Sequence, residues 1–194
     1  MLLPTIIDRV ADNGYCIVDN FLPKQQSQAL YDYSQQLPAQ YWNMAGIGRQ
    51  QSQTINTMVR NDRIYWLTPD QPEHADYLAI MEELRVEFNR SLFMGLFDYE
   101  CHLAHYPNGA FYKKHLDAFK GRSNRVLTTV FYLNPEWREE DGGQLVIYGA
   151  KGEVLETVLP QQGRLVVFLS DRFVHEVLPS KRDRFSVTGW FRIN

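Results

Sequence analysis

The chain has 194 residues, of which 44% are hydrophobic and 13% aromatic, enough to build the core of one domain. Acidic and basic residues nearly balance, and a formal net charge of −3 argues against a broad surface for nucleic-acid phosphates. No stretch approaches the roughly 20 consecutive apolar residues of a membrane span. The amino terminus lacks the basic segment and long apolar run of a signal peptide. We expect a single domain over residues 1–194, in a cytoplasmic protein that binds neither membrane nor nucleic acid.

The amino-terminal half is predicted to be mainly helical. The spacing of apolar residues predicts a short helix over 4–12, a strand over 15–21 and a second helix over 24–37. The longest predicted helix covers 72–94. Its expected buried stripe consists of Leu78, Met81, Leu84, Phe88, Leu92 and Phe93. Residues 45–57 are rich in Gly, Gln, Ser and Asn without periodicity, which predicts a mobile loop or lid.

From Tyr99 onward the sequence is typical of short strands. Turn signals at 107–109, 134–135 and 141–143 separate these strands. Helices followed by strands predict an α+β fold with a double-stranded β-helix (jelly-roll) core. We expect helical support mainly from residues 1–98 and the core mainly from 99–194. No oligomerising stripe is visible, so a monomer is expected.

A metal site is predicted from His115, Asp117 and His175. Two histidines and one carboxylate can hold one face of a ferrous ion and leave the opposite face open for a keto acid and oxygen. Residues two apart on a strand point the same way, so His115 and Asp117 can share one ion. The run before His175 predicts a strand, a turn at 170–172 and a second strand, which would bring His175 in from elsewhere in the sheet. This combination indicates an oxygenase.

A polar pocket wall is predicted from the strand RFSVTGWFR, residues 184–192. Its side chains divide by alternation into two faces. Phe185, Val187 and Phe191 make one face apolar. The other face carries Arg184, Ser186, Thr188 and Trp190. An arginine and two hydroxyls on one face suit a pocket better than an ordinary core.

Several runs of this sequence closely resemble the 2-oxoglutarate- and iron(II)-dependent prolyl hydroxylases. The runs are HYPNGAFYKKHLD, TTVFYLNPEWREEDGGQL and SDRFVHEVLPSKRDRFSVTGWF, with DNGYCIVDNFL and VRNDRIYWL earlier in the chain. The likeness is to the oxygen-sensing animal enzymes and their bacterial relatives, and it covers most of the chain. The three longest runs contain His115, Asp117, His175 and Arg184.

The resemblance implies a role for each matching residue. His115, Asp117 and His175 would be the iron ligands and catalytic residues. Arg184 would pair with the distal carboxylate of 2-oxoglutarate through two charge-assisted hydrogen bonds. The other cosubstrate residues would be Tyr132, Tyr106, Leu145 and Thr188. The residues on the substrate side would be Arg125, Trp190, Tyr112, Arg60 and Asp62, the last two at the base of the lid.

The reaction that the resemblance implies is hydroxylation of a prolyl residue in a protein substrate. Fe(II), 2-oxoglutarate and O2 would take part, succinate and CO2 would be released, and ascorbate is a candidate reductant. Bacterial enzymes of this type are associated with elongation factor Tu, which is the expected partner. Two alternatives stay open: an oxygenase of the same chemistry acting on a small molecule or other non-prolyl substrate, and a non-catalytic metal-binding jelly roll.

Some of these residues also have simpler interpretations. Arg60 and Asp62 could form an ordinary surface ion pair. Tyr106, Tyr112 and Tyr132 could be core aromatics. His102 and His105 are three apart on a strand, so they should face opposite ways and cannot form a rival metal pair. His74 is expected in solvent on a helix. Basic residues near the metal motif would serve solubility or recruit an acidic protein surface; they are Lys113, Lys114, Lys120, Arg122 and Arg125.

The two cysteines, Cys16 and Cys101, form no spacing motif. We expect both to be reduced and buried.

Overall fold

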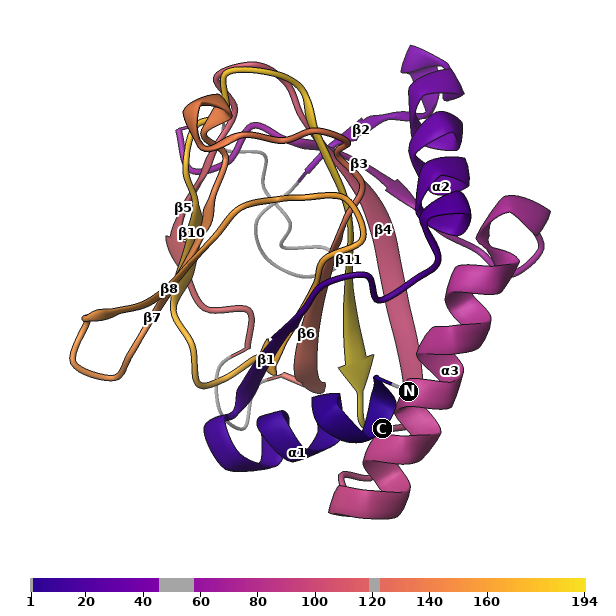
Figure 1. The fold of residues 1–194 in the computed structure, drawn as a ribbon, viewed down its shortest axis with the longest axis vertical. Helices are drawn as coiled ribbons and strands as arrows, with labels where there is room; N and C mark the ends of the chain where they lie inside the picture. Colours follow the sequence, from indigo (N-terminus) through magenta and orange to yellow (C-terminus); the bar gives the residue numbers. More distant parts are fainter. Residues whose placement is uncertain (1, 46–57, 119–122) are drawn as a thin grey trace.

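The computed structural model describes residues 2–45, 58–118 and 123–194, and these form two facing antiparallel sheets (Figure 1). The larger sheet has the strand order β1-β9-β6-β11-β4-β3-β2, and the smaller has β5-β10-β7-β8. The strands of the larger sheet are β1 (Tyr15–Val18), β2 (Asn43–Met44), β3 (Arg63–Trp66), β4 (Asp98–Tyr106), β6 (Arg125–Tyr132), β9 (Leu165–Leu169) and β11 (Arg184–Arg192). Those of the smaller sheet are β5 (Tyr112–His115), β7 (Leu145–Tyr148), β8 (Val154–Val158) and β10 (His175–Val177).

Three α-helices come from the amino-terminal half, as predicted: α1 (Leu3–Asn13), α2 (Lys24–Gln36) and α3 (Pro72–Leu92). Within the described residues, the short 3-10 helices η1 (Ala39–Tyr41) and η3 (Glu139–Asp141) lie in connections. Helix α1 ends at Gly14, whose φ of 82° is a left-handed conformation that glycine adopts without strain. In Figure 1 the helices lie along the larger sheet, away from the smaller one. The prediction of an α+β fold with a double-sheet core braced by helices is confirmed.

The larger sheet separates two apolar clusters, because alternate side chains point to opposite faces. Its outer face packs against the helices, with Phe185, Val187 and Phe191 of β11 in this cluster. Its inner face meets the smaller sheet around Tyr132 and Phe168. The two predicted faces of β11 are therefore confirmed: the apolar face covers the helix side, and the face with Arg184 looks into the space between the sheets.

Some local predictions were wrong. Strand β1 ends at Val18, so the strand predicted over 15–21 is shorter. Phe93 is 89% exposed and outside the buried stripe, because α3 ends there with a left-handed residue of φ 54°. His74 is fully buried instead of solvated. Its Nδ1 donates to the carbonyl of Thr68, and its ring packs edge-on against Tyr33 because α2 covers this side of α3.

Both cysteines are free and buried, as predicted. Within the described part of the chain, none of the helices combines the length and the apolar character needed to cross a membrane.

Candidate metal and cosubstrate site

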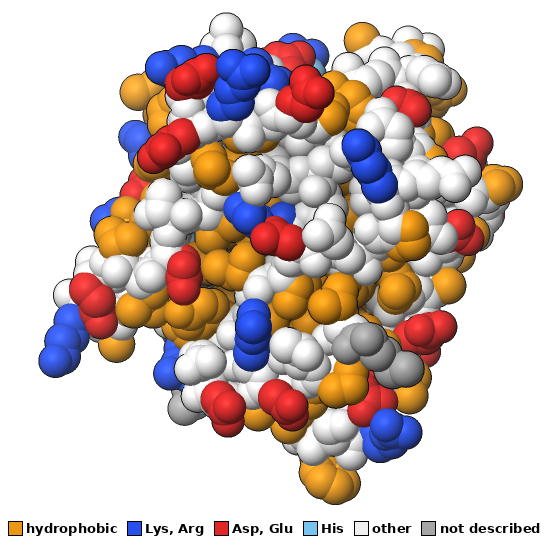
Figure 2. Space-filling model, viewed as in Figure 1, with side chains coloured by type: hydrophobic (Ala, Val, Ile, Leu, Met, Phe, Trp, Pro, Cys, Tyr) orange, Lys and Arg blue, Asp and Glu red, His pale blue; other side chains and the backbone are white. Residues whose placement is uncertain are grey.

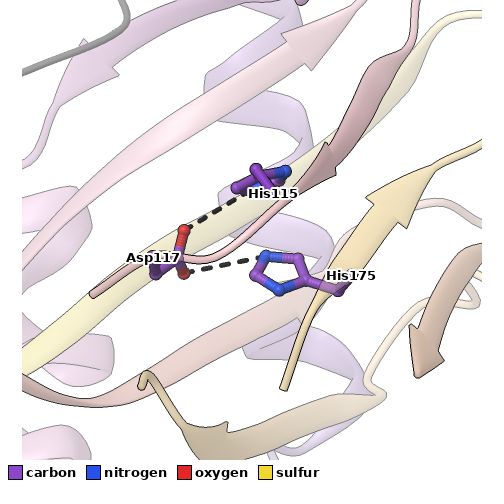
Figure 3. Close-up of side chains that lie close together, drawn as sticks. All are labelled: His115, Asp117 and His175. Atoms are coloured by element: carbon purple, nitrogen blue, oxygen red, sulfur yellow. Dashed lines mark ion pairs between the residues drawn. The ribbon is translucent and has the colours of Figure 1, made fainter. Parts of the chain in front are cut away.

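The candidate metal site lies at the end of the smaller sheet. His115 ends β5 and is paired in register with His175, the first residue of β10. Asp117 lies in a bend just beyond β5, so it reaches the site from the strand's end and not from within the strand, as the alternation argument assumed. Its Oδ1 is 3.4 Å from Nε2 of His115, and its Oδ2 is 3.7 Å from Nε2 of His175 (Figure 3). One ligand atom of each side chain lies within 4.8 Å of the others, so one ion can contact all three.

Both imidazoles are held in the tautomer that binds a metal through Nε2. Nδ1 of His115 donates to the carbonyl of Lys113 at 2.8 Å, and Nδ1 of His175 donates to that of Phe173 at 3.0 Å. A carbonyl only accepts, so each Nδ1 carries the proton and each Nε2 keeps its lone pair. Burial lowers the pKa of His175 to about 4, and the neighbouring His115 acts in the same direction. His175 is therefore neutral near pH 7, as a metal ligand must be.

The carboxylate of Asp117 is oriented by two donors on one oxygen. Its Oδ2 accepts from Oγ1 of Thr128 at 2.8 Å and from Nε1 of Trp190 at 3.0 Å. The Thr128 hydroxyl donates its only proton to Asp117. In the contact between Thr128 and Ser170, at 2.9 Å, Ser170 is therefore the donor. Burial by itself would raise the pKa of Asp117, but His175, His115 and the Trp190 N–H together hold that pKa well below its ordinary value. The carboxylate is therefore ionised.

The floor of the space between the sheets holds a buried arginine. Arg184 is 1% exposed, and its Cζ lies 4.9 Å from the ring centroid of Tyr106 and 5.0 Å from that of Tyr132. Its Nε donates to the carbonyl of Gly143 at 2.9 Å. Gly143 has a φ of 68°, and a Cβ there would lie 3.1 Å from Cδ of Arg184. Glycine is therefore the residue that lets the backbone approach the guanidinium this closely.

Among the described residues, three buried polar atoms at this floor have no hydrogen-bond partner: Nη2 of Arg184, the hydroxyl of Tyr132 and Oγ of Ser186. Ser186 pairs with Tyr132 across β11 and β6 and shares the inner face of β11 with Arg184. Within the described ranges, Arg184 also forms no ion pair with a carboxylate. Unpaired buried donors are costly, and a carboxylate, which only accepts, would satisfy all three. The floor therefore fits the distal carboxylate of 2-oxoglutarate.

The other residues predicted for the cosubstrate pocket line the same space. Leu145 of β7 is buried in one cluster with Tyr106 and Tyr132. Thr188 lies on the inner face of β11, between Arg184 and Trp190, and is half-buried. All the predicted cosubstrate residues thus lie on the inner side of the two sheets.

On one side of the site mouth, an ion pair lies against Tyr112, which in turn stacks on the candidate ligand His115. Nε and Nη2 of Arg60 donate to the two oxygens of Asp62 at 2.7 and 2.6 Å. Cζ of Arg60 lies 4.2 Å from the ring centroid of Tyr112, which stacks on His115 with centroids 3.5 Å apart. Asp62 is 0% exposed, so the simpler interpretation of this pair as a surface ion pair is wrong.

On the other side of the mouth, Arg125 lies flat over Trp190. Its Cζ is 3.5 Å from the indole ring centroid, and its Nη2 is 2.8 Å from a carboxylate oxygen of Glu100. His102 contributes a third ring, 5.5 Å from Trp190, whereas His105 stacks on Phe185 on the helix side of the sheet. The two histidines therefore face opposite ways, as predicted.

The basic neighbourhood is only partly available to a partner. Arg125 is paired with Glu100, and Lys114 places its ammonium 3.7 Å above the Tyr148 ring. Lys113 is exposed. Lys120, Arg122 and most of the predicted lid, residues 46–57, lie outside the described residues. On the face shown in Figure 2, acidic and basic side chains are interspersed, without one broad patch of either sign.

Sequence reasoning missed four residues that support the site. Thr128 and Tyr132 are four apart on one strand, so alternation could have placed Thr128 on the inner face. Gly143 appeared only as a turn residue, although its position beside Arg184 depends on glycine. Ser170 and Glu100 gave no local signal, because their partners are 42 and 25 residues away in the chain.

Comparison with known proteins places this site in a family context. Residues 101–192 match the 2OG-Fe(II) oxygenase superfamily. The chain is 28% identical over 200 residues to Egl nine homolog 1 of Homo sapiens, covering 98% of this chain and 46% of that protein. It is 28% identical over 208 residues to the hypoxia-inducible factor prolyl hydroxylase of Caenorhabditis elegans, covering 96% of this chain and 27% of that one. The chain thus spans less than half the length of either relative.

Solved structures, two prolyl hydroxylases among them, also resemble this chain over almost its whole length. A prolyl-4-hydroxylase of Pseudomonas putida superposes with a TM-score of 0.90 at 41% identity, and the match covers 99% of both chains. A prolyl hydroxylase of Trichoplax adhaerens, solved with a peptide fragment of the hypoxia inducible factor oxygen degradation domain, gives a TM-score of 0.83 at 29% identity. That match covers 98% of this chain and 89% of the other.

Proposed function

Because this chain belongs to the 2-oxoglutarate- and iron(II)-dependent prolyl hydroxylase family, we propose that it hydroxylates a prolyl residue of a protein substrate. One observation carries this proposal above the others. A His-Asp-His cluster with both Nε2 atoms beside one carboxylate faces the same space between the sheets as a buried guanidinium whose Nη2 has no hydrogen-bond partner among the described residues. These are the two elements that a ferrous ion and a dicarboxylic keto acid require together.

In this proposal His115, Asp117 and His175 hold the ferrous ion. Iron and 2-oxoglutarate, when bound, supply the oxidising chemistry that uses O2 and yields succinate and CO2. The backbone carbonyls of Lys113 and Phe173 keep both imidazoles in the ligating tautomer. Thr128 and Trp190 occupy Oδ2 of Asp117 and leave Oδ1 for the ion.

The far end of 2-oxoglutarate is assigned to the floor of the pocket. Arg184 would donate from Nη2, with Tyr132 and Ser186 adding hydroxyl donors to the same carboxylate. Tyr106, Leu145 and Thr188 would form the walls that hold the cosubstrate in position and exclude water. Burial of these groups strengthens each polar contact with the cosubstrate.

The target proline is assigned to the mouth. Trp190 and Tyr112 both contact the candidate metal cluster, Trp190 through its hydrogen bond to Asp117 and Tyr112 through its stack on His115. An arginine packs on each ring, so both rings would give the mouth rigid edges that orient the substrate. Arg125 would use a remaining N–H to bind a backbone carbonyl of the substrate, while Arg60 and Asp62 fix the Tyr112 side.

The finer proposal names the substrate as elongation factor Tu. Its support is the resemblance to bacterial prolyl hydroxylases, together with the 41% identity to the Pseudomonas putida prolyl-4-hydroxylase. The test treats cell-extract proteins with active enzyme or with the His175→Ala variant and searches by mass spectrometry for prolines that gain one oxygen atom. A hydroxyproline in elongation factor Tu that depends on active enzyme supports the proposal, and one in another protein alone rejects this substrate.

A second measurement separates the alternatives. Iron-dependent succinate release from 2-oxoglutarate is measured with and without proline-containing peptides. Stimulation by peptide supports prolyl hydroxylation. Slow release that no peptide stimulates favours an oxygenase for a small molecule, and no release at all favours a non-catalytic metal-binding protein.

A further inference from the structure

Glu100 joins two arginines at the mouth of the site. Its Oε1 accepts from Nε of Arg125 at 3.0 Å and lies 2.8 Å from Nη2 of the same arginine, and its Oε2 accepts from Nη1 of Arg192 at 2.7 Å. Arg192 in turn pairs with Asp98 through Nε at 2.8 Å. Both oxygens of Glu100 are therefore used, and the side chain is held from two sides.

The Arg125–Glu100 pair crosses an intervening strand. Arg125 begins β6, Glu100 belongs to β4, and β11 lies between these two strands in the sheet. Trp190 of β11 is the direct register partner of Glu100. To reach Glu100, the Arg125 side chain must therefore pass over the indole, which explains why its guanidinium lies 3.5 Å from the indole centroid.

This pair differs from a common exposed ion pair in its contacts. The side chains of Arg125 and Glu100 are 23% and 22% exposed, so solvent screens them less than it screens a fully exposed pair. Below them, Trp190 is only 6% exposed and donates to the carboxylate of Asp117. A continuous set of contacts thus runs from Glu100 through Arg125 and Trp190 to a candidate metal ligand.

We propose that Glu100 is a positioning residue. It holds the Arg125 guanidinium flat over Trp190 and thereby fixes the position of the groups that would contact the substrate at the mouth. Nε and Nη2 of Arg125 face Glu100, which leaves Nη1 as the donor for a substrate carbonyl. With the guanidinium fixed, less side-chain entropy is lost when substrate binds. This part rests on the proposed function, whereas the clamp on Trp190 can be tested without turnover.

The first test uses fluorine NMR on protein labelled with 5-fluorotryptophan, with the Trp190 resonance assigned through Trp190→Phe. We expect Glu100→Gln to shift the Trp190 resonance and to increase its sensitivity to exchange of H2O for D2O, because the indole loses its cover. Glu100→Asp should restore part of the wild-type spectrum. The control is Asp19→Asn, which weakens another arginine–carboxylate pair, that of Asp19 with Arg164, elsewhere on the molecule and should leave Trp190 unchanged. An unchanged Trp190 resonance in Glu100→Gln would overturn the clamp.

The second test measures steady-state kinetics with the proline-containing peptide that best stimulates the wild-type protein. We expect Glu100→Gln to raise the peptide KM about tenfold, the effect of weakening one charge-assisted hydrogen bond, with kcat and the KM for 2-oxoglutarate within about twofold. An unchanged peptide KM would overturn the substrate-side role. Failure of the wild-type protein to use any prolyl peptide would instead reject the proposed function, and the NMR result would still decide the clamp.

Discussion

The arginine at the floor of the site and the arginines at its mouth differ in whether a carboxylate of this chain pairs with them. At the mouth, Arg60 donates two hydrogen bonds to Asp62, and Arg125 donates one hydrogen bond to Glu100 and forms an ion pair with it. At the floor, Arg184 is more deeply buried, yet its Nη2 has no hydrogen-bond partner among the described residues. A buried cation without an anion is unfavourable, so the floor is arranged for an anion that comes from outside the chain. The mouth arginines are already neutralised and mainly shape the surface.

The largest expected effect lies at the metal cluster, between floor and mouth. Asp117→Ala removes one of the three proposed ligands and the acceptor of Thr128 and Trp190, so we expect succinate formation to fall by about a thousandfold or more. Activity is measured by succinate release and iron content by a colorimetric assay. Asp19→Ala is the control for loss of a carboxylate. Near-normal turnover by Asp117→Ala would contradict the ligand assignment.

Replacing Arg184 at the floor should weaken the binding of 2-oxoglutarate without lowering the stability of the protein. Arg184→Gln removes an unpaired buried cation, so we expect the KM for 2-oxoglutarate to rise about a hundredfold, while the protein unfolds at the same or a higher temperature. Thermal unfolding with and without 2-oxoglutarate and manganese(II) checks both parts, since wild type alone should be stabilised by the keto acid. A large loss of stability in the ligand-free variant would mean that Arg184 is structural.

The opposite result is expected at the mouth. Arg60→Gln leaves the fully buried carboxylate of Asp62 without its cation, and we expect the free energy of unfolding to drop by about 3 kcal/mol. Urea unfolding measures this change. The double variant Arg60→Gln with Asp62→Asn should recover part of the loss because the buried charge is removed. If Arg60→Gln is as stable as wild type, Arg60 at the mouth does not stabilise the fold, and it does not differ from Arg184 at the floor in this respect.

The smallest effect is expected at Ser186. Ser186→Ala removes one neutral hydroxyl that faces the same floor, so we expect the KM for 2-oxoglutarate to rise about fivefold with little change in stability. Thermal unfolding and kinetics at varied 2-oxoglutarate check this. Ser34→Ala serves as a control, because this serine is also buried but belongs to α2, on the helix side of the larger sheet. If both variants change the KM for 2-oxoglutarate equally, Ser186 does not bind the carboxylate.

Short-range sequence patterns determined much of this protein. Alternation along 184–192 correctly divided Arg184 from Phe185, because a strand has a fixed period of two. Helical spacing located α1, α2 and α3 to within about two residues. The His115-x-Asp117 spacing and the runs shared with prolyl hydroxylases identified the family, since those features lie in contiguous segments.

Only the tertiary structure decided which distant groups meet. The burial of His74 depends on α2 packing over α3, and the supports of Asp117 come from Thr128 and Trp190 on two other strands. The pairing of Glu100 with Arg125 likewise follows from strand order, because the two residues lie on either side of β11. Local propensity has a range of a few residues, whereas hydrogen bonds and ion pairs depend on distance in space, which the order of strands in the sheet sets.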